Sequence, residues 1–280
     1  MRIWQISFLM AFIFTAGSSL GAEKFTFNPE DGFEFRESQT MIMTTELGMK
    51  GMPPLKGLFE VTKDVKVEKS GNNFTVTTTP VSYSNTVNGV EFKEPSMWVS
   101  ANSQEKFTVS KKGKIKKITG YKEKFDELTS GLTPEEEGMY GKNFNEDYLY
   151  KTFKESWKLM VSSDVGKSTR KGTKWSVKSV MYRPDDDKLA IKVDKEVGDR
   201  VACNDKDTEI RCIVVSYTYN YNELGKDPNG VIIAGKGEKI VDPKTMILYS
   251  EKSHYFMELD VKNIGKTVTE VKSEYSIEVK

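Results

Sequence analysis

Alternation of apolar and polar residues is the feature that most limits how this chain can fold. Between residues 33 and 47 one parity is apolar and the other carries charged and hydroxyl side chains; the apolar members are Phe33, Phe35, Met41, Met43 and Leu47. The segment 271–279 repeats the pattern. A period of two places successive side chains on opposite faces of a strand. The pattern predicts an antiparallel sheet with one apolar and one solvated face.

Turn-forming residues divide the alternating segments into strands. Beyond the first, strands are predicted at about 58–68, 74–84, 90–100, 106–110, 114–119, 174–183, 188–203, 209–222, 231–241, 246–261 and 267–279. Several exceed the five or six residues of an ordinary strand, and long adjacent antiparallel strands coil. We therefore expect a mainly β (α+β) protein with a strongly curved antiparallel sheet or half-barrel of about 10–13 strands.

The period changes to that of a helix in the middle of the chain. Tyr121, Phe125 and Leu128 fall at helical spacing, and after Asn145 a second stripe follows: Leu149, Phe153, Trp157 and Met160. Apolar helix stripes have to be buried, and the apolar face of the sheet is their natural partner. The sequence thus predicts one β-rich domain over 23–280, with strand sets at 23–120 and 174–280 and a central helical insert at 121–160 packed on the sheet.

Residues 1–22 have the order of an export signal. Arg2 precedes an apolar run from Phe8 to Ala16, and small residues follow up to Ala22. The run is too short to span a bilayer, so we expect cleavage after Ala22 and a periplasmic or secreted protein. A cysteine that could carry a lipid is absent from the cleavage site. Because the mature sequence contains no apolar run near 18 residues, we also expect it to be soluble, without a transmembrane segment.

Cys203 and Cys212 are the only cysteines and are separated by eight residues. Export places them in an oxidising compartment, and an even spacer lets two antiparallel strands hold them opposite each other across a hairpin. A redox pair would favour C-x-x-C spacing, and a metal site needs more ligands than two sulfurs. We predict a structural disulfide that stabilises the fold by about 2.5–3 kcal/mol.

Charge and motif content exclude several classes of function. The chain has 42 Lys and Arg and 41 Asp and Glu, so we expect no nucleic-acid partner. His254 is the single histidine, which excludes His-based zinc sites, and no acidic cluster has the spacing of a calcium loop. We expect a non-enzymatic protein with no catalytic residue, metal site or cofactor. A carboxylate pair of a hydrolase stays open, because its spacing is spatial rather than sequential.

Methionines gather early in the chain. Met41 and Met43 share the apolar parity with Phe35, which favours core packing over a copper site. Met49 and Met52 fall in a Gly- and Pro-rich loop over 48–54, where exposed methionines would form an adaptable hydrophobic rim over a cavity.

Two short segments resemble a known group of proteins. They are Gly172-Thr173-Lys174-Trp175 and Gly235-Lys236-Gly237, the latter followed by Ile240–Thr245. Similar segments occur in uncharacterised exported bacterial β-rich proteins that resemble the half-barrel lipoprotein carriers of the LolA/LppX type. The chain departs from them at Met246, where a glycine is expected. The resemblance implies a cavity for an apolar ligand and no particular chemistry.

The leading hypothesis is an exported binding protein that holds an apolar or amphipathic ligand, such as a lipid, between the curved sheet and the helices. The predicted ligand-binding residues are Met41, Met43, Phe153, Trp157 and Met160. An envelope or surface module that binds a protein partner and lacks a cavity is the alternative. A carboxylate-dependent hydrolase is the third hypothesis.

Overall fold

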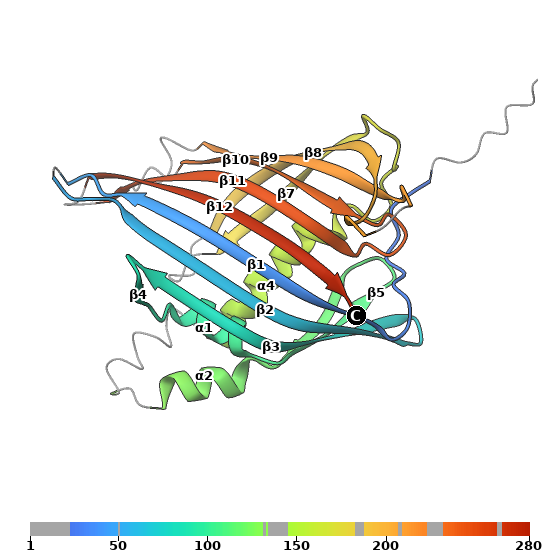
Figure 1. Cartoon of the computed structure of the whole chain (residues 1–280), viewed down its shortest axis with the longest axis horizontal. Helices are drawn as coiled ribbons and strands as arrows, with labels where there is room; N and C mark the ends of the chain where they lie inside the picture. Colours follow the sequence, from blue (N-terminus) through green and yellow to red (C-terminus); the bar gives the residue numbers. More distant parts are fainter. Residues whose placement is uncertain are drawn as a thin grey trace, which may run out of the picture.

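A single curved antiparallel sheet, open along one side, dominates the computed structural model (Figure 1). The structure describes residues 23–280 except 50, 131–132, 134–144, 183–187, 207–208, 223–231 and 262–264. The predicted export signal, residues 1–22, therefore lies outside the described residues. The described part contains twelve strands in this sheet, which confirms the predicted fold class.

Six strands precede the helical insert and six follow it. The first set is β1 (Phe33–Glu46), β2 (Leu55–Ser70), β3 (Asn73–Val87), β4 (Val90–Glu91), β5 (Glu105–Ser110) and β6 (Ile115–Thr119). The second set is β7 (Lys174–Tyr182), β8 (Lys188–Val201), β9 (Cys212–Asn222), β10 (Ile232–Val241), β11 (Leu248–Val261) and β12 (Gly265–Val279). The spatial order is β6-β5-β3-β2-β1-β12-β11-β10-β9-β8-β7, with β4 paired to β3. The two sets join where β1 pairs with β12, so they form one sheet.

Three described helices pack on the sheet and on one another. They are α1 (Pro95–Asn102), α2 (Tyr121–Thr129) and α4 (Glu146–Trp157), and α4 continues into a π-helical turn, η1 (Lys158–Ser162). The side chain of Asn145 caps α4 by accepting a hydrogen bond from the Tyr148 amide at 2.8 Å. Helix α4 packs against both edge strands, β6 and β7. It therefore bridges the open side of the half-barrel.

The exposed edge of β7 is protected by this helix. Glu155 of α4 accepts hydrogen bonds from the Ser179 hydroxyl at 2.7 Å and from the Val180 amide at 3.4 Å. Bonding an edge strand to a side chain from a covering helix removes groups that could pair with another chain.

The prediction of a strand at 90–100 is wrong. Strand β4 covers two residues, and α1 begins at Pro95. The Glu94 carboxylate accepts a hydrogen bond from the Met97 amide at 2.6 Å, and proline at the first helical position is already set for a helical φ. These local start signals outweigh the short alternation.

One end of the half-barrel is closed by a large hydrophobic core, called here the closed core. The N-terminal segment crosses this end, where Phe25 donates its amide to the Lys167 carbonyl at 2.9 Å. The buried members come from both strand sets and include Phe25, Phe27, Phe35, Val65, Phe74, Phe107, Ile213, Val215 and Tyr249. Cys203 and Cys212 belong to this core and are disulfide-bonded, as predicted.

The turn after β10 contains Met246, the position at which the resemblance to the half-barrel carriers predicts a glycine. Met246 has a φ of 59°, the left-handed conformation that favours glycine. Its side chain is buried in the closed core. Burial of the side chain offsets the backbone cost, which is about 1–2 kcal/mol for a residue with a Cβ.

Candidate functional site

Charged and tyrosine side chains occupy inward-facing positions at mid-height of the sheet. On β8, Lys195 lies between the buried Val193 and Val197 on the same face, and on β10 Lys239 has the inward parity of Val241. The set is called here the polar belt: Glu37, Lys63, Glu105, Asp164, Lys195, Tyr217, Lys239, Glu251 and Tyr275. Strand register places its members next to each other, as in Lys195 opposite Tyr217, Lys239 opposite Glu251 and Glu251 opposite Tyr275.

Asp164 is the centre of one half of the belt. It is fully buried just after η1, and its carboxylate accepts hydrogen bonds from Lys195 Nζ at 2.7 Å and Lys239 Nζ at 2.6 Å. The two ammonium groups also donate to the main-chain carbonyls of Leu159 and Met160, respectively. Carbonyls at the end of a helix lack partners within the helix and face its negative pole. Two strand lysines thus hold the end of the helical insert on the sheet.

Burial and charge oppose each other in this cluster. Burial alone would raise the pKa of Asp164, but Lys239 and Lys195 hold it below its usual range. Burial, together with the neighbouring charge of Lys239, lowers the pKa of Lys195 to about 8 against the opposing effect of Asp164. The free energy of unfolding is therefore reduced by part of the cost of desolvating a lysine.

The depressed pKa of Lys195 gives the protein a pH dependence. Between about pH 8 and the unfolded value of 10.5, the unfolded chain binds a proton that the folded chain has lost. We expect the free energy of unfolding to rise with pH from about 8 to about 10, by up to about 1.4 kcal/mol per pH unit, before tyrosines of the unfolded chain ionise. Urea unfolding of wild type and Lys195→Met checks this.

The matched control is Lys192→Met, which removes an exposed lysine from the outer face of the same strand. This variant should keep the rise. An equal rise in Lys195→Met and wild type would show that another group titrates.

The other half of the belt repeats the arrangement around α1. Lys63 and Glu105 are both buried and lie 3.1 Å apart. Lys63 also donates to the Ser100 carbonyl in the last turn of α1 at 2.8 Å, while Thr78 donates to Glu105 at 3.0 Å. As with Asp164, a buried ion pair ties a helix end to the sheet. These charges fix the helices in place rather than line an open site.

Two carboxyl–tyrosine pairs connect the halves. Tyr275 donates to Glu37 at 3.2 Å, and Tyr217 donates to Glu251. Burial raises the pKa of Glu37 against the opposing charge of Lys63, and burial likewise raises the pKa of Glu251 against the bond from Tyr217. The belt is therefore a hydrogen-bonded polar layer across the inside of the half-barrel.

Beyond the belt, on the side away from the closed core, the inner face is apolar and aromatic. Its partly exposed side chains are called here the open-end surface: Met41, Met43, Tyr83, Tyr219, Tyr255 and Met257. A single row runs from Tyr219 through Gly235, Tyr255 and Val271 to Met43, because these residues are register partners on adjacent strands. The rings of Tyr219 and Tyr255 lie 6.5 Å apart. This surface lies inside the half-barrel near the β1–β2 hairpin.

The glycines of β10 allow one tyrosine from each neighbouring strand to lie close against this strand. A Cβ at Gly237 would stand 2.4 Å from the Tyr217 ring, and one at Gly235 would stand 2.3 Å from Tyr255 Cβ. Only glycine permits so close an approach. Close packing of these tyrosines thus explains the two glycines of the Gly235-Lys236-Gly237 segment.

The five predicted ligand residues are not brought together. Met41 and Met43 belong to the open-end surface, whereas Phe153, Trp157 and Met160 pack against the closed core on the other side of the belt. The rings of Phe153 and Trp157 lie 5.1 and 5.2 Å from that of Phe107. Where η1 meets the sheet, beside Leu159 and Lys239, the space between them is about 10 Å³, enough for about one water molecule.

The belt residues were missed by the sequence interpretation, although a signal for them exists. Glu37 and Gln39 stand on the apolar parity between Phe35 and Met41, and Lys195 interrupts the run of buried residues on β8. A charge on the apolar parity of a long strand is costly to bury unless it is paired. Such interruptions could have been identified as members of buried ion pairs. The partners of these residues could not have been identified from the sequence.

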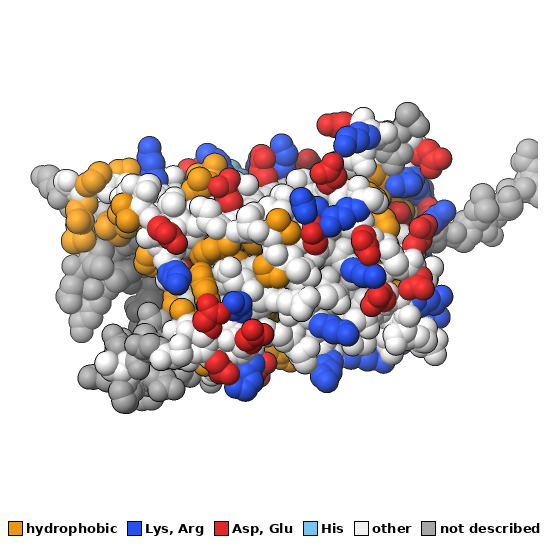
Figure 2. All heavy atoms as spheres, turned by 60° about the horizontal axis from the view of Figure 1, so that its bottom comes forward, with side chains coloured by type: hydrophobic (Ala, Val, Ile, Leu, Met, Phe, Trp, Pro, Cys, Tyr) orange, Lys and Arg blue, Asp and Glu red, His pale blue; other side chains and the backbone are white. Residues whose placement is uncertain are grey.

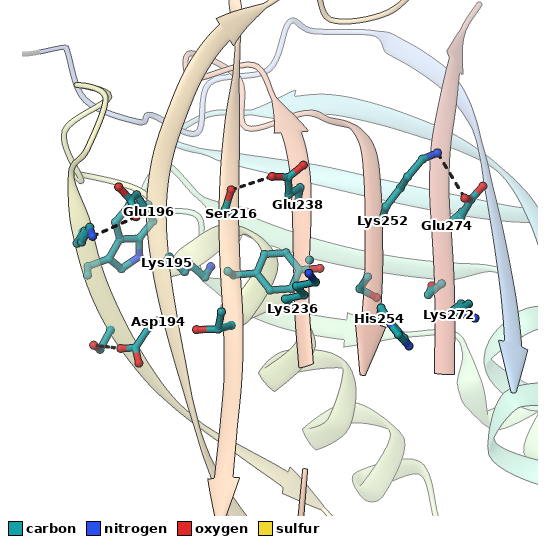
Figure 3. Close-up of a pocket in the computed structure, with 18 residues that line it drawn as sticks. Asp194, Lys195, Glu196, Ser216, Lys236, Glu238, Lys252, His254, Lys272 and Glu274 are labelled. Carbon is teal, nitrogen blue, oxygen red and sulfur yellow. Dashed lines mark hydrogen bonds and ion pairs between the residues drawn. The ribbon is translucent and has the colours of Figure 1, made fainter. Parts of the chain in front are cut away.

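A groove of about 940 Å³ lies across strands β7 to β12 (Figure 3). Its charges are largely neutralised within it: Lys252 pairs with Glu274 at 3.4 Å, Lys174 pairs with Glu196 at 3.2 Å, and Ser216 donates to Glu238 at 3.1 Å. His254, the single histidine, is half-buried at its edge and lies 2.7 Å from Glu270. This arrangement is typical of the solvated face of a sheet.

The described residues contain no group of three or more His, Cys, Asp or Glu side chains that could hold a metal ion. Within the same residues, no helix is long and apolar enough to cross a membrane.

Comparison with known proteins finds a distant likeness in fold. No protein-family model and no curated protein matches the chain. A solved structure described as "lipid-protein interactions in lipovitellin" matches with a TM-score of 0.49 and 12% sequence identity. The match covers 89% of this chain and 25% of the other, so this chain spans about a quarter of that protein's length.

Proposed function

We propose that the protein is an exported binding protein that holds an apolar or amphipathic ligand of lipid type on the open-end surface. The supporting observation is the contrast across the polar belt. Apolar side chains on one side are buried in the closed core, whereas Met41, Met43 and Tyr255 on the other side stay partly exposed inside the half-barrel. Apolar surface left open in a protected concave place is typical of ligand sites.

The side chains of this surface suit a flexible apolar ligand. Methionine adapts its shape to an irregular partner, and tyrosine offers a large apolar area with a polar tip. Because the space beside η1 has room for about one water, the ligand body lies over the strands, near Met41 and Met43, rather than among Phe153, Trp157 and Met160.

Met43→Lys tests this proposal. It places a charge on the apolar row opposite Val271, and we expect the Kd for the fluorescent probe N-phenyl-1-naphthylamine to rise about tenfold or more. Saturable fluorescence enhancement of the purified protein measures the affinity. Ile42→Lys is the matched control, since Ile42 is the next residue on the same strand, faces outward and is 51% exposed.

The ligand proposal fails if wild type shows no saturable probe binding and if organic extraction of the purified protein followed by mass spectrometry yields no lipid. That result would favour the interaction module without a cavity. An equal loss in Met43→Lys and Ile42→Lys would mean that the probe binds elsewhere.

We also propose that the protein is not an enzyme. Asp164 and Glu105 are held by lysines, and Glu37 and Glu251 by tyrosines. Carboxyls bonded in this way serve the fold rather than the acid and base roles of a glycosidase pair.

A further inference from the structure

Two rows of inward positions beyond the polar belt are uncharged. The row of register partners that contains Met43 runs from Val87 on β3 to Val177 on β7, and its members are valine, glycine, methionine and tyrosine. The next row toward the β1–β2 hairpin includes Leu55, Thr45, Thr269, Met257 and Ile233. The rows share a face, because every second residue of a strand points the same way. The open-end surface is therefore neutral across most of the sheet.

The outer positions of the same strands are charged. The outer row that passes through Ile42, the residue before Met43, contains Lys272, His254, Lys236 and Asp194. Figure 2 shows acidic and basic side chains intermixed over the surface of the molecule. On the inner face, the charges of the polar belt are already bonded to one another or to tyrosines. A charged ligand group on the open-end surface would therefore leave water without gaining a counter-charge, which costs free energy.

The helical insert adds no unpaired charge to these rows from the side chains that contact them. Leu159 of η1 packs against the cluster that contains Ile233. The Glu155 carboxylate of α4 approaches the β7 end of the rows, where it accepts a hydrogen bond from the Ser179 hydroxyl and pairs with Lys158 at 2.9 Å. This carboxylate is therefore already neutralised by a partner.

Uncharged hydrogen-bonding groups lie between the neutral rows and the belt. Ser253 and Ser273 are register partners that point inward, and both are half-buried. Gln39 Nε2 donates to Ser273 Oγ at 3.5 Å, a long bond that a ligand group can replace. The Ser253 hydroxyl has no hydrogen-bond partner among the described residues. Each hydroxyl can donate to and accept from a ligand oxygen.

We propose that the ligand of the open-end surface is an uncharged lipid with a hydroxyl head, such as a fatty alcohol or a partial acylglycerol. Its hydroxyl bonds to Ser253 and Ser273, and its hydrocarbon chain lies along the two neutral rows. The inference rests on the proposed function and names the class of ligand for the same site. A head of this kind forms hydrogen bonds with the serines and requires no counter-charge.

Three ligands with the same chain and different heads test this class: dodecanol, dodecanoate and dodecylammonium. Isothermal titration calorimetry of wild type at neutral pH, below the micellar concentrations, should give a Kd for dodecanol at least about tenfold lower than for either ion. An equal or lower Kd for either ion would overturn the inference, since the head would then lie in water or meet a counter-charge.

Met43→Lys separates a neutral site from the general preference of apolar surfaces for alcohols. The added ammonium group lies one row from Ser273 and should reduce the preference for dodecanol over dodecanoate by about tenfold or more, while the preference over dodecylammonium widens. Unchanged ratios would show that the head binds elsewhere, and would also overturn the inference.

Ser253→Ala/Ser273→Ala tests the two hydroxyl groups. The loss of hydrogen bonds should raise the Kd for dodecanol about three- to tenfold. Ser276→Ala is the matched control, because Ser276 is exposed on the outer face of β12 and should leave this Kd unchanged. An equal Kd in the double variant and the control would contradict the role of the serines.

The outcomes separate this inference from the proposed function. If wild type binds N-phenyl-1-naphthylamine saturably but prefers an ion to dodecanol, the inference is wrong and the ligand proposal stands. If wild type binds neither the fluorescent probe nor dodecanol, the ligand proposal fails and this inference fails with it.

Discussion

Asp164→Asn is expected to lower the free energy of unfolding by about 3–5 kcal/mol, because it leaves two buried ammonium groups beside each other without a counter-charge. Lys195 and Lys239 are 2% and 1% exposed and both donate to the Asp164 carboxylate. A neutral amide keeps the shape of the site but supplies half of its acceptors. The end of η1 should loosen from the sheet as well, since the same lysines bond its carbonyls.

Urea unfolding at neutral pH, followed by tryptophan fluorescence, measures the loss. The matched control is Asp199→Asn, which breaks an exposed pair with Lys171 in which both side chains are 69% exposed. An exposed pair is worth about 0–1 kcal/mol, so this variant should unfold nearly as wild type does. The deficit of Asp164→Asn should shrink as the pH rises toward about 8 and stay constant above it, because loss of the Asp164 charge lowers the pKa of Lys195 and the variant loses this proton at a lower pH than wild type. If Asp164→Asn lost no more stability than the control, the Asp164 carboxylate would contribute little to offsetting the cost of burying the two lysines.

Trp157→Ala is expected to cost about 3–5 kcal/mol of stability, the range found when a large aromatic side chain leaves a core. The indole packs edge-on against Phe27 and Phe107 at ring distances of 6.0 and 5.2 Å. Its Nε1 donates to the Gly113 carbonyl at 2.7 Å, so the variant also loses this hydrogen bond, while Ser162 still donates to the same carbonyl at 2.8 Å. Thermal and urea unfolding measure the effect.

This variant also decides between the two locations of the ligand. The sequence interpretation placed Trp157 in the binding site, whereas the structure places it in the closed core. We expect Trp157→Ala to bind the probe with unchanged affinity under conditions where it is folded. If Trp157→Ala kept its stability but lost probe binding, the ligand site would lie at helix α4 instead. Phe92→Ala, which truncates a half-exposed aromatic residue directly after β4, should leave stability within about 0.5 kcal/mol of wild type.

Local patterns predicted the elements well where one signal acted alone. The parity of Phe33, Phe35 and Met41 predicted β1, and the stripe that includes Leu149 and Phe153 predicted α4. The spacing of Cys203 and Cys212 predicted the disulfide. The prediction failed at α1, where a capping residue and a proline at 94–95 competed with a short alternation and won.

The polar belt could not be predicted in the same way because its partners are remote. Lys239 meets Asp164 across 75 positions, and Lys63 meets Glu105 across 42. Along the chain, each of these residues looks like an error in the alternation or an ordinary surface charge. Only the sheet register and the position of the helical insert show that they neutralise one another.

By itself, the sequence determined which face of each strand is apolar, since side-chain direction follows from a period of two that is set locally. The tertiary structure decided what each apolar position faces. Phe153 and Trp157 lie in the closed core because the N-terminal segment and β5 bring Phe27 and Phe107 against them. Met41 and Met43 have the same apolar character, yet they lie beyond the polar belt and stay partly exposed. Burial depends on what the curvature of the sheet places opposite a residue, and that is set by contacts between distant segments.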